Sequence, residues 1–393
     1  MIGLAILGAT GSVGVNTLDV VARNPGRFAV RALTGCRNWP VLLEQCRRFS
    51  PSVAVLADDA AAAQLAAAVA AEGLAVEVRS GAAALEDVAR REDVDAVMAA
   101  IVGAAGLLPT LAAARAGKRV LLANKEAVVM AGRLLNEALI ASGGTLVPID
   151  SEHNALFQCL PDGRGDDPDG AGVVGLLLTA SGGPFLDTPV EALASVTPDA
   201  ACQHPNWEMG RKISVDSATM MNKGLEIIEA CWLFGVDPER VRVVVHPESI
   251  VHSLVEYRDG SVLAQLGNPD MRTPIAHALA WPERMLSGAK PLDLVALGRL
   301  SFRPAEPERF PCLGLAITAA KARGGAPVVL NAANEAAVAA FLAGTIGFTS
   351  ISTVIDSVLA QYAGPDPADL EAILALDAES RLSAEEKIRD LAL

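Results

Sequence analysis

Residues 4–14, LAILGATGSVG, decide the fold of the amino-terminal part of this 393-residue chain. Their first four residues are apolar and predict a buried strand, three glycines follow at GxxGxxG spacing, and residues 15–22 have helical character. Strand, glycine turn and helix in this order are typical of a dinucleotide site, because the helix start offers free N–H groups to a pyrophosphate. Thr10 stands where GxGxxG has its second glycine, so a tight turn without a ligand is the alternative.

The alternation of strand and helix continues to about residue 150. Short apolar and β-branched runs predict further strands at 29–33, 53–57, 75–78, 96–100, 120–123 and 146–149. Alanine-rich segments lie between them, such as the predicted helix at 59–71, which Asp58 would cap and Gly73 would end. Repeated βαβ units imply a parallel sheet, so we predict an α/β protein whose residues 1–150 form a Rossmann-like domain that binds a dinucleotide.

NADPH is favoured over NADH by the end of the second predicted strand. Enzymes that bind NAD usually place Asp or Glu there for the ribose 2′-hydroxyl. This chain has TGCRN at residues 34–38, without a carboxylate, and Arg37 would pair with a 2′-phosphate. The alternative is that Arg37 is an ordinary solvated side chain.

Beyond residue 150 the pattern changes. The segment 161–172 is rich in Gly, Pro and Asp and predicts a surface loop. Strands at 173–178 and 241–245 flank a helical stretch near 217–234, and Asp259-Gly260 predicts a hairpin between 254–257 and 261–266. Residues from 313 predict helices at 313–323, 328–343 and 351–361, and at 369–391 in pieces. We therefore predict an α+β catalytic domain at 151–285 with a lid near 203–212, a linker at 286–312 and a helical domain at 313–393.

Composition excludes several classes of protein. The formal net charge is −14, whereas general nucleic-acid binders present basic surfaces. No apolar run reaches the roughly 18 residues that a membrane span needs, and the first residues lack the basic flank of a secretory signal. Six cysteines are scattered without CxxC spacing, as in a reducing cytoplasm. We expect a cytoplasmic protein that binds neither nucleic acid nor membrane.

Carboxylates in two places would suit a metal ion. Asp150 and Glu152 follow the strand at 146–149 and would face the same way in an extended segment. Glu226 and Glu229 lie on one face of a predicted helix. Carboxylates gathered by a fold repel each other unless a cation lies among them, and oxygen ligands suit Mg²⁺ or Mn²⁺. Spacing alone leaves a solvated acidic face as the alternative.

Donor-rich segments would suit an anionic substrate. SGGP at 181–184 follows a predicted strand and exposes N–H groups, and Ser217, Asn222 and Lys223 add the donors and charge that a phosphate needs. Residues 204–212 are polar around Trp207, as in a mobile lid. Helix capping by the serines and a packing role for Trp207 are the alternatives.

Asn124-Lys125-Glu126 follows the predicted strand at 120–123. Residues just beyond the carboxyl end of a parallel strand line the ligand crevice, so Lys125 would reach an oxygen of substrate or cofactor. A polar helix start is the alternative.

Taken in order, these segments resemble the 1-deoxy-D-xylulose 5-phosphate reductoisomerase family. The resemblance runs from about residue 3 to the end. It rests on the glycine loop and on LANKE at 122–126, PIDSEH at 148–153, SGGPF at 181–185, the run from His204 to Glu229, NPDMRTP at 268–274 and NAANE at 331–335. The chain departs from the family pattern at Cys36, at Cys231 and in the loop 161–172.

The resemblance implies an enzyme that rearranges and reduces 1-deoxy-D-xylulose 5-phosphate to 2-C-methyl-D-erythritol 4-phosphate, in non-mevalonate isoprenoid precursor synthesis. It implies NADPH, Mg²⁺ or Mn²⁺, and a homodimer. Asp150, Glu152 and Glu226 would hold the metal and, with Lys125, be catalytic. The substrate would contact Ser151, Glu152, Ser181, His204, Trp207, Ser217, Asn222, Lys223, Glu226 and His252. The cofactor would contact Thr10, Gly11, Ser12, Val13, Gly14, Gly35, Arg37, Asn38, Asn124, Lys125, Glu126, Met209, Gly210 and Met271.

Two other interpretations stay open at this point. An NADPH dehydrogenase of the semialdehyde or homoserine type would share the opening glycine loop but would need a different catalytic set, and a metal requirement separates the two. A non-catalytic nucleotide-sensing relative would have lost carboxylates and lid residues, whereas Glu226, Trp207 and Lys223 are all present.

Overall fold

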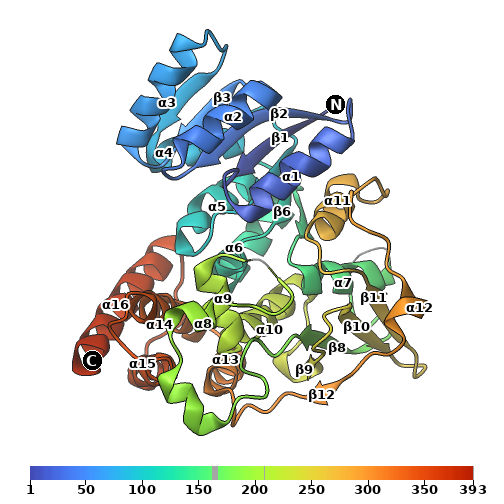
Figure 1. Cartoon of the computed structure of the whole chain (residues 1–393), viewed down its shortest axis with the longest axis vertical. Coiled ribbons are helices and arrows are strands. Elements are labelled where there is room, and N and C mark those ends of the chain that lie inside the picture. Colours follow the sequence, from blue (N-terminus) through green and yellow to red (C-terminus); the bar gives the residue numbers. More distant parts are fainter. Residues whose placement is uncertain (162–166, 208, 393) are drawn as a thin grey trace. The chain divides into compact units, whose positions relative to one another are not determined.

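The computed structural model describes residues 1–161, 167–207 and 209–392 (Figure 1). These residues form two compact units. The first unit comprises Met1–Ala127, Arg133–Asn154 and Asp270–Lys290. The second comprises Val128–Gly132, Ala155–Pro269 and the residues from Pro291 onward. The domain boundaries that we predict at residues 150, 285 and 312 divide the chain by function and not by compactness, so they stay a prediction.

A seven-stranded sheet forms the centre of the first unit, with every pair of neighbouring strands parallel and the order β4-β3-β2-β1-β5-β6-β7. Its strands are β1 (Ile2–Leu7), β2 (Phe28–Gly35), β3 (Val53–Leu56), β4 (Glu77–Ser80), β5 (Ala96–Ala99), β6 (Arg119–Leu122) and β7 (Thr145–Pro148). β3 and β5 are buried throughout, as expected for strands covered by helices on both faces. The Rossmann-like prediction is confirmed, and the strand order reverses between β1 and β5, where such folds bind ligands.

Helices connect these strands at the predicted places. They are α1 (Ser12–Arg23), α2 (Trp39–Phe49), α3 (Asp59–Ala71), α4 (Gly81–Arg90), the 3₁₀ turn η1 (Ala104–Gly106), α5 (Leu107–Arg115) and α6 (Lys125–Ser142). The Asp58 carboxylate accepts the Ala61 N–H at 2.9 Å, which confirms the predicted cap of α3. A later segment, α11 (Arg272–Ala280), packs against α1 and β7 (Figure 1).

The second unit contains a five-stranded mixed sheet in the order β11-β10-β8-β9-β12. Its strands are β8 (Val173–Ala180), β9 (Val241–Val245), β10 (Val251–Tyr257), β11 (Val262–Leu266) and β12 (Arg303–Pro304). β10 and β11 form the predicted hairpin, and Gly260 has φ +86 in its turn. β12 shows that part of the proline-rich segment joins the sheet edge.

Helices make up the rest of the second unit. They are α7 (Ser151–Cys159), which begins in the first unit, and η3 (Val190–Ser195), α8 (Pro198–Ala201), α9 (Arg211–Ala218), α10 (Met221–Phe234), η4 (Pro238–Arg240), α12 (Leu294–Leu297), α13 (Pro311–Ala322), α14 (Ala326–Leu342), α15 (Ser350–Gln361) and α16 (Leu370–Asp390). The single helix predicted near 217–234 is wrong at its start, because Met220 adopts φ +58 and separates α9 from α10.

Helix α16 corrects another prediction. Residues 370–390 form one continuous helix rather than pieces, and Asp369 caps it by accepting the Ala372 N–H at 2.9 Å. Its buried positions recur every three or four residues, but two of them, Asp377 and Ser380, are polar, which weakens the apolar pattern. No helix within the described residues is both long and apolar enough to span a membrane.

Candidate active site

The glycine turn after β1 uses its three glycines differently. Gly8 has φ +85, and a side chain there would lie 2.6 Å from the Ala100 carbonyl oxygen. A side chain at Gly14 would lie 2.5 Å from Ala9 Cα. At Gly11 the nearest atom would be the Gly8 carbonyl oxygen at 3.4 Å, and the residue is exposed. Gly8 and Gly14 therefore close the turn, and Gly11 keeps its outer face open.

The start of α1 is suited to an anion. Gly11 is its N-cap and makes no side-chain capping hydrogen bond, and the first turn contains no acidic residue. Ser12 is exposed, while Thr10 and Val13 are partly exposed. N–H groups at an uncapped helix start carry partial positive charge, so this segment can bind a pyrophosphate.

Arg37 lies just beyond the end of β2, at Gly35, in an exposed position. Its Nε donates to Asp58 Oδ2 at 3.0 Å, and its side chain is 82% exposed, so a ligand can still reach it. The neighbouring Asn38 caps α2 by accepting the Val41 N–H at 3.4 Å.

Lys125 and Asp150 form a buried ion pair at the carboxyl ends of β6 and β7. Lys125 Nζ lies 2.6 Å from Asp150 Oδ2, and the two side chains are 6% and 13% exposed. His153 Nδ1 lies 3.2 Å from Asp150 Oδ1. Burial alone would raise the pKa of Asp150, but the charge of Lys125 and the His153 hydrogen bond hold it well below its usual value. Asp150 is therefore an ionised carboxylate available to a cation.

The prediction that Asp150 and Glu152 face the same way in an extended segment is wrong. The chain is not extended there, because α7 begins at Ser151 and Glu152 lies in its first turn. The Glu152 N–H instead donates to Asp150 Oδ1 at 3.2 Å, and Ser151 Oγ donates to Glu152 Oε2 at 2.7 Å. A helix start, rather than strand alternation, brings these polar groups together.

Asn124 and Glu126 begin α6, and both are buried. Asn124 Oδ1 accepts the Ala127 N–H at 2.8 Å, and its Nδ2 donates to the Gly103 carbonyl at 3.0 Å and to Glu126 Oε2 at 3.2 Å. Asn124 therefore caps the helix, which agrees with the alternative prediction of a polar helix start. A cofactor contact by either residue stays a prediction.

In the second unit, Ser181 lies at the end of β8 and contacts His204. Ser181 Oγ lies 2.9 Å from His204 Nε2 and accepts the Gly183 N–H at 3.1 Å. Gly183 has φ +68, and a side chain there would lie 2.8 Å from the Ser217 carbonyl oxygen. The predicted phosphate-binding residues Ser181 and Ser217 thus belong to neighbouring backbone segments.

The segment that we predict as a lid, residues 203–212, is fastened to the turn between β9 and β10. Asn206 Nδ2 donates to the Pro247 carbonyl at 2.6 Å and to Ser249 Oγ at 2.9 Å. The Trp207 ring lies 6.1 Å, between centroids, from the ring of the buried His252. Two predicted cofactor contacts follow in this segment: Met209 is partly exposed, and Gly210 is the exposed N-cap of α9. Glu208, which precedes them, lies outside the described residues.

The first turns of α10 gather the remaining donors around a carboxylate. Asn222 Nδ2 donates to Glu226 Oε1 at 2.5 Å, and Lys223 Nζ pairs with Glu226 Oε2. Lys223 is 4% exposed and Glu226 is fully buried. Burial, aided by the charges of His246 and Lys223, lowers the pKa of His252 to about 4, so His252 is neutral beside this cluster.

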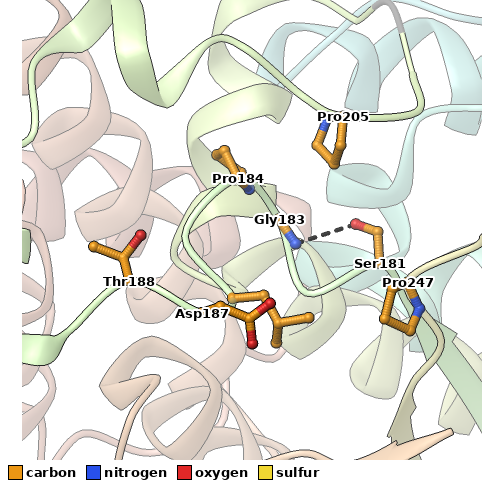
Figure 2. Close-up of a pocket in the computed structure, with 8 residues that line it drawn as sticks. Ser181, Gly183, Pro184, Asp187, Thr188, Pro205 and Pro247 are labelled. Atoms are coloured by element: carbon orange, nitrogen blue, oxygen red, sulfur yellow. Dashed lines mark hydrogen bonds between the residues drawn. The ribbon is translucent and has the colours of Figure 1, made fainter. Parts of the chain in front are cut away.

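A pocket of about 430 Å³ opens beside Ser181 in the second unit (Figure 2). Figure 2 shows the hydrogen bond between Ser181 and the Gly183 N–H at its wall, with Pro205 of the lid segment also lining it. The lining residues are Ser181, Gly183, Pro184, Leu186, Asp187, Thr188, Pro205 and Pro247.

Sequence reasoning missed two of these contacts. His153 holds Asp150, and its spacing of three residues at a helix start was a usable signal. Asn206 donates hydrogen bonds to Pro247 and Ser249, which lie 41 and 43 positions further along the chain, so no local pattern indicates them. The predicted contact Met271 precedes α11 in the first unit and is partly exposed.

Comparison with known proteins identifies a family whose sequence profiles match this chain. The profile described as 1-deoxy-D-xylulose 5-phosphate reductoisomerase matches residues 4–132, and its two C-terminal-domain profiles match residues 146–234 and 266–383. A relative of that name from Aromatoleum aromaticum is 61% identical over 385 residues, which cover 98% of this chain and 96% of the relative.

Solved structures agree with this match. A DOX-P reductoisomerase crystallised with NADPH, fosmidomycin and magnesium is 49% identical, with a TM-score of 0.96 over 99% of this chain and 98% of that one. The enzyme from Zymomonas mobilis in complex with NADPH is 48% identical, with a TM-score of 0.92 over 99% and 100% of the two chains. The chain therefore belongs to the 1-deoxy-D-xylulose 5-phosphate reductoisomerase family.

Proposed function

We propose that this protein converts 1-deoxy-D-xylulose 5-phosphate into 2-C-methyl-D-erythritol 4-phosphate, with NADPH and a divalent cation. The observation that carries the proposal is the buried Lys125–Asp150 pair. It lies at the same edge of the parallel sheet as the glycine turn, since both follow carboxyl ends of strands. A carboxylate held ionised beside a dinucleotide site is what a metal-assisted reduction of a carbonyl requires.

Asp150, Glu152 and Glu226 are the proposed ligands of Mg²⁺ or Mn²⁺. Their donor atoms are all carboxylate oxygens, which these hard cations prefer. The pKa of Asp150 is held well below its usual value by the charge of Lys125 and the His153 hydrogen bond, and the fully buried Glu226 accepts hydrogen bonds from Asn222 and Lys223. The bound cation supplies a Lewis acid that stabilises negative charge on the hydroxyketone oxygens.

Residues of the second unit bind the phosphate of the substrate in this proposal. Ser181, Ser217, Asn222 and Lys223 provide hydroxyl, amide and ammonium donors, and His252 borders them with a neutral ring. Binding energy from the phosphate, remote from the reacting carbons, orients the substrate for reaction. The lid segment with His204 and Trp207 then keeps water from the reactive aldehyde.

NADPH would supply the hydride for the reduction, and most of its proposed contacts lie in the first unit. The start of α1 binds the pyrophosphate and Arg37 binds the 2′-phosphate. The remaining proposed contacts are those predicted from the sequence: Gly35, Asn38, Asn124, Lys125, Glu126, Met209, Gly210 and Met271. Lys125 keeps Asp150 in place and faces the substrate near the metal.

The test is NADPH consumption, followed by absorbance, with 1-deoxy-D-xylulose 5-phosphate before and after chelation of divalent cations. Oxidation of NADPH that stops on chelation and returns with Mg²⁺ or Mn²⁺ supports the proposal. Oxidation that continues at the same rate after chelation would favour a dehydrogenase of the semialdehyde or homoserine type. Folded protein that binds NADPH but never oxidises it would be a non-catalytic relative.

Two further parts of the proposal follow from the family. We propose a homodimer in the cytoplasm, and the scattered cysteines, which form no disulfide among the described residues, are compatible with a reducing compartment. Light scattering of the purified protein measures the mass of the assembly. A monomeric mass at assay concentration would contradict the dimer.

A further inference from the structure

The motif NAANE at residues 331–335 lies on α14, and the proposed reaction gives it no role. Asn334 is fully buried, and its Nδ2 donates to Oδ1 of Asp216 on α9 at 2.9 Å. Asp216 is itself only 1% exposed. The amide must present its nitrogen to the carboxylate, because the opposite orientation would place two oxygens against each other.

Asp216 is a central residue of the junction between α9 and α10. Its Oδ2 pairs with Lys212 Nζ at 2.9 Å on its own helix. Its backbone carbonyl accepts the Thr219 hydroxyl at 3.2 Å, and that hydroxyl oxygen accepts the N–H of Met221, the first residue of α10, at 3.3 Å. The side chain of Asn334 therefore fastens this junction to the helical core.

The same junction carries the proposed phosphate-binding side chains. Ser217 follows Asp216 directly, and Asn222 and Lys223 lie in the first turn of α10. The turn that bears Ser181 packs on the Ser217 backbone through Gly183. A movement of α9 away from α14 would shift these donors relative to one another.

We propose that Asn334 is a positioning residue for phosphate binding, acting through Asp216. The proposal rests on the proposed function, since it concerns how this enzyme holds its phosphorylated substrate. Asn334 touches neither substrate nor cofactor in this scheme. It fixes α9 so that Ser217, Asn222 and Lys223 converge on one anion.

Asn331 provides a matched control in the same motif. It is also fully buried on α14, three residues earlier, but its Nδ2 lies 3.4 Å from Glu335 Oε1. Glu335 pairs with Arg381 at 2.7 Å, and Arg381 pairs with Asp377 at 2.7 Å. This network joins α14 to α16.

The experiment measures KM for 1-deoxy-D-xylulose 5-phosphate, KM for NADPH and kcat in the whole enzyme. Asn334→Ala should raise KM for the sugar phosphate about tenfold, the effect of one hydrogen bond to a charged group. KM for NADPH should stay within about twofold of wild type, and kcat should fall less than KM for the sugar phosphate rises, because the remaining phosphate contacts still orient the substrate. Asn331→Ala should leave all three values near wild type.

A double-mutant cycle then identifies the path. In an Asp216→Ala background, Asn334→Ala should add little further change in KM, because the acceptor through which Asn334 acts is gone. Asn334→Ser, which keeps a donor, serves in the same tests if the Ala variant does not fold. An unchanged KM in the folded variant, or an equal rise in Asn331→Ala, would overturn the proposal. An inactive wild-type enzyme would instead refute the proposed function.

Discussion

Nε2 of His204 lies 2.9 Å from Oγ of Ser181 and carries the ring proton. The proton must be on Nε2, because Nδ1 accepts the backbone N–H groups of Asn206 and Trp207 at 3.1 and 3.0 Å. His204 therefore donates to Ser181, and the Ser181 hydroxyl proton can be donated to another acceptor, which our proposal identifies as a phosphate oxygen. A neutral histidine thus joins the segment that we predict as a lid to Ser181.

This arrangement predicts how stability depends on pH. Burial lowers the pKa of His204, His252 and His277 to about 4 in each case, from an ordinary value of 6.5. The unfolded chain binds protons that the folded protein excludes, so stability present above about pH 6.5 is lost as the pH falls toward 4. Thermal unfolding midpoints across this range should fall steadily, and His204→Gln should flatten the slope. A midpoint that is constant over the range would contradict the neutral histidines.

Replacing Glu226 should separate catalysis from cofactor binding. Glu226→Gln removes a proposed metal ligand and should lower kcat by at least about a hundredfold. NADPH binding, measured by the fluorescence of the bound cofactor, should remain near wild type because the glycine turn is unaltered. Turnover at the wild-type rate would remove Glu226 from the metal site.

Arg37 should control the preference for NADPH over NADH. Arg37→Ala should raise KM for NADPH about tenfold and leave KM for NADH nearly unchanged, since only NADPH carries the 2′-phosphate. Arg48→Ala is a matched control, because Arg48 is an exposed arginine of α2 that stacks on Phe49. Parallel losses for both cofactors would show that Arg37 acts on the fold rather than on the phosphate.

The lid anchor should affect substrate binding and proteolysis together. Asn206→Ala removes the hydrogen bonds to Pro247 and Ser249, each contributing about 1 kcal/mol. KM for the sugar phosphate should rise several-fold, and limited proteolysis should cut the segment near residues 204–210 faster. Gln203→Ala, at an exposed neighbouring position, should behave as wild type. Equal cleavage of both variants would show that Asn206 does not hold the lid.

The sequence predicted the first sheet well because its signals are local. Short apolar runs between glycine-rich turns place β1 to β7 within about two residues, and Asp58 caps α3 as its residue type indicates. The order of motifs also indicated the family, which the comparisons confirm. These features depend on neighbours along the chain, so spacing and composition contain them.

Other features depend on tertiary contacts and could not be predicted. The segment after β7 begins a helix at Ser151, although the same residues would fit an extended chain. The hydrogen bond from Asn334 to Asp216 joins residues 118 positions apart, and nothing in either local pattern pairs them. Helix α16 is continuous because its scattered apolar positions pack on α14, a contact that its own sequence only weakly indicates.

The glycine turn also limits how this protein can evolve. Any side chain at Gly8 or Gly14 collides with backbone atoms that cannot move without opening the sheet or the helix, so these two positions are closed to variation. Gly11 is sterically open, and its φ of −83 is accessible to every amino acid. Of the three glycines, only Gly11 can therefore be replaced when cofactor binding changes, by natural or laboratory selection. We expect related sequences to vary at position 11 and to keep glycine at positions 8 and 14.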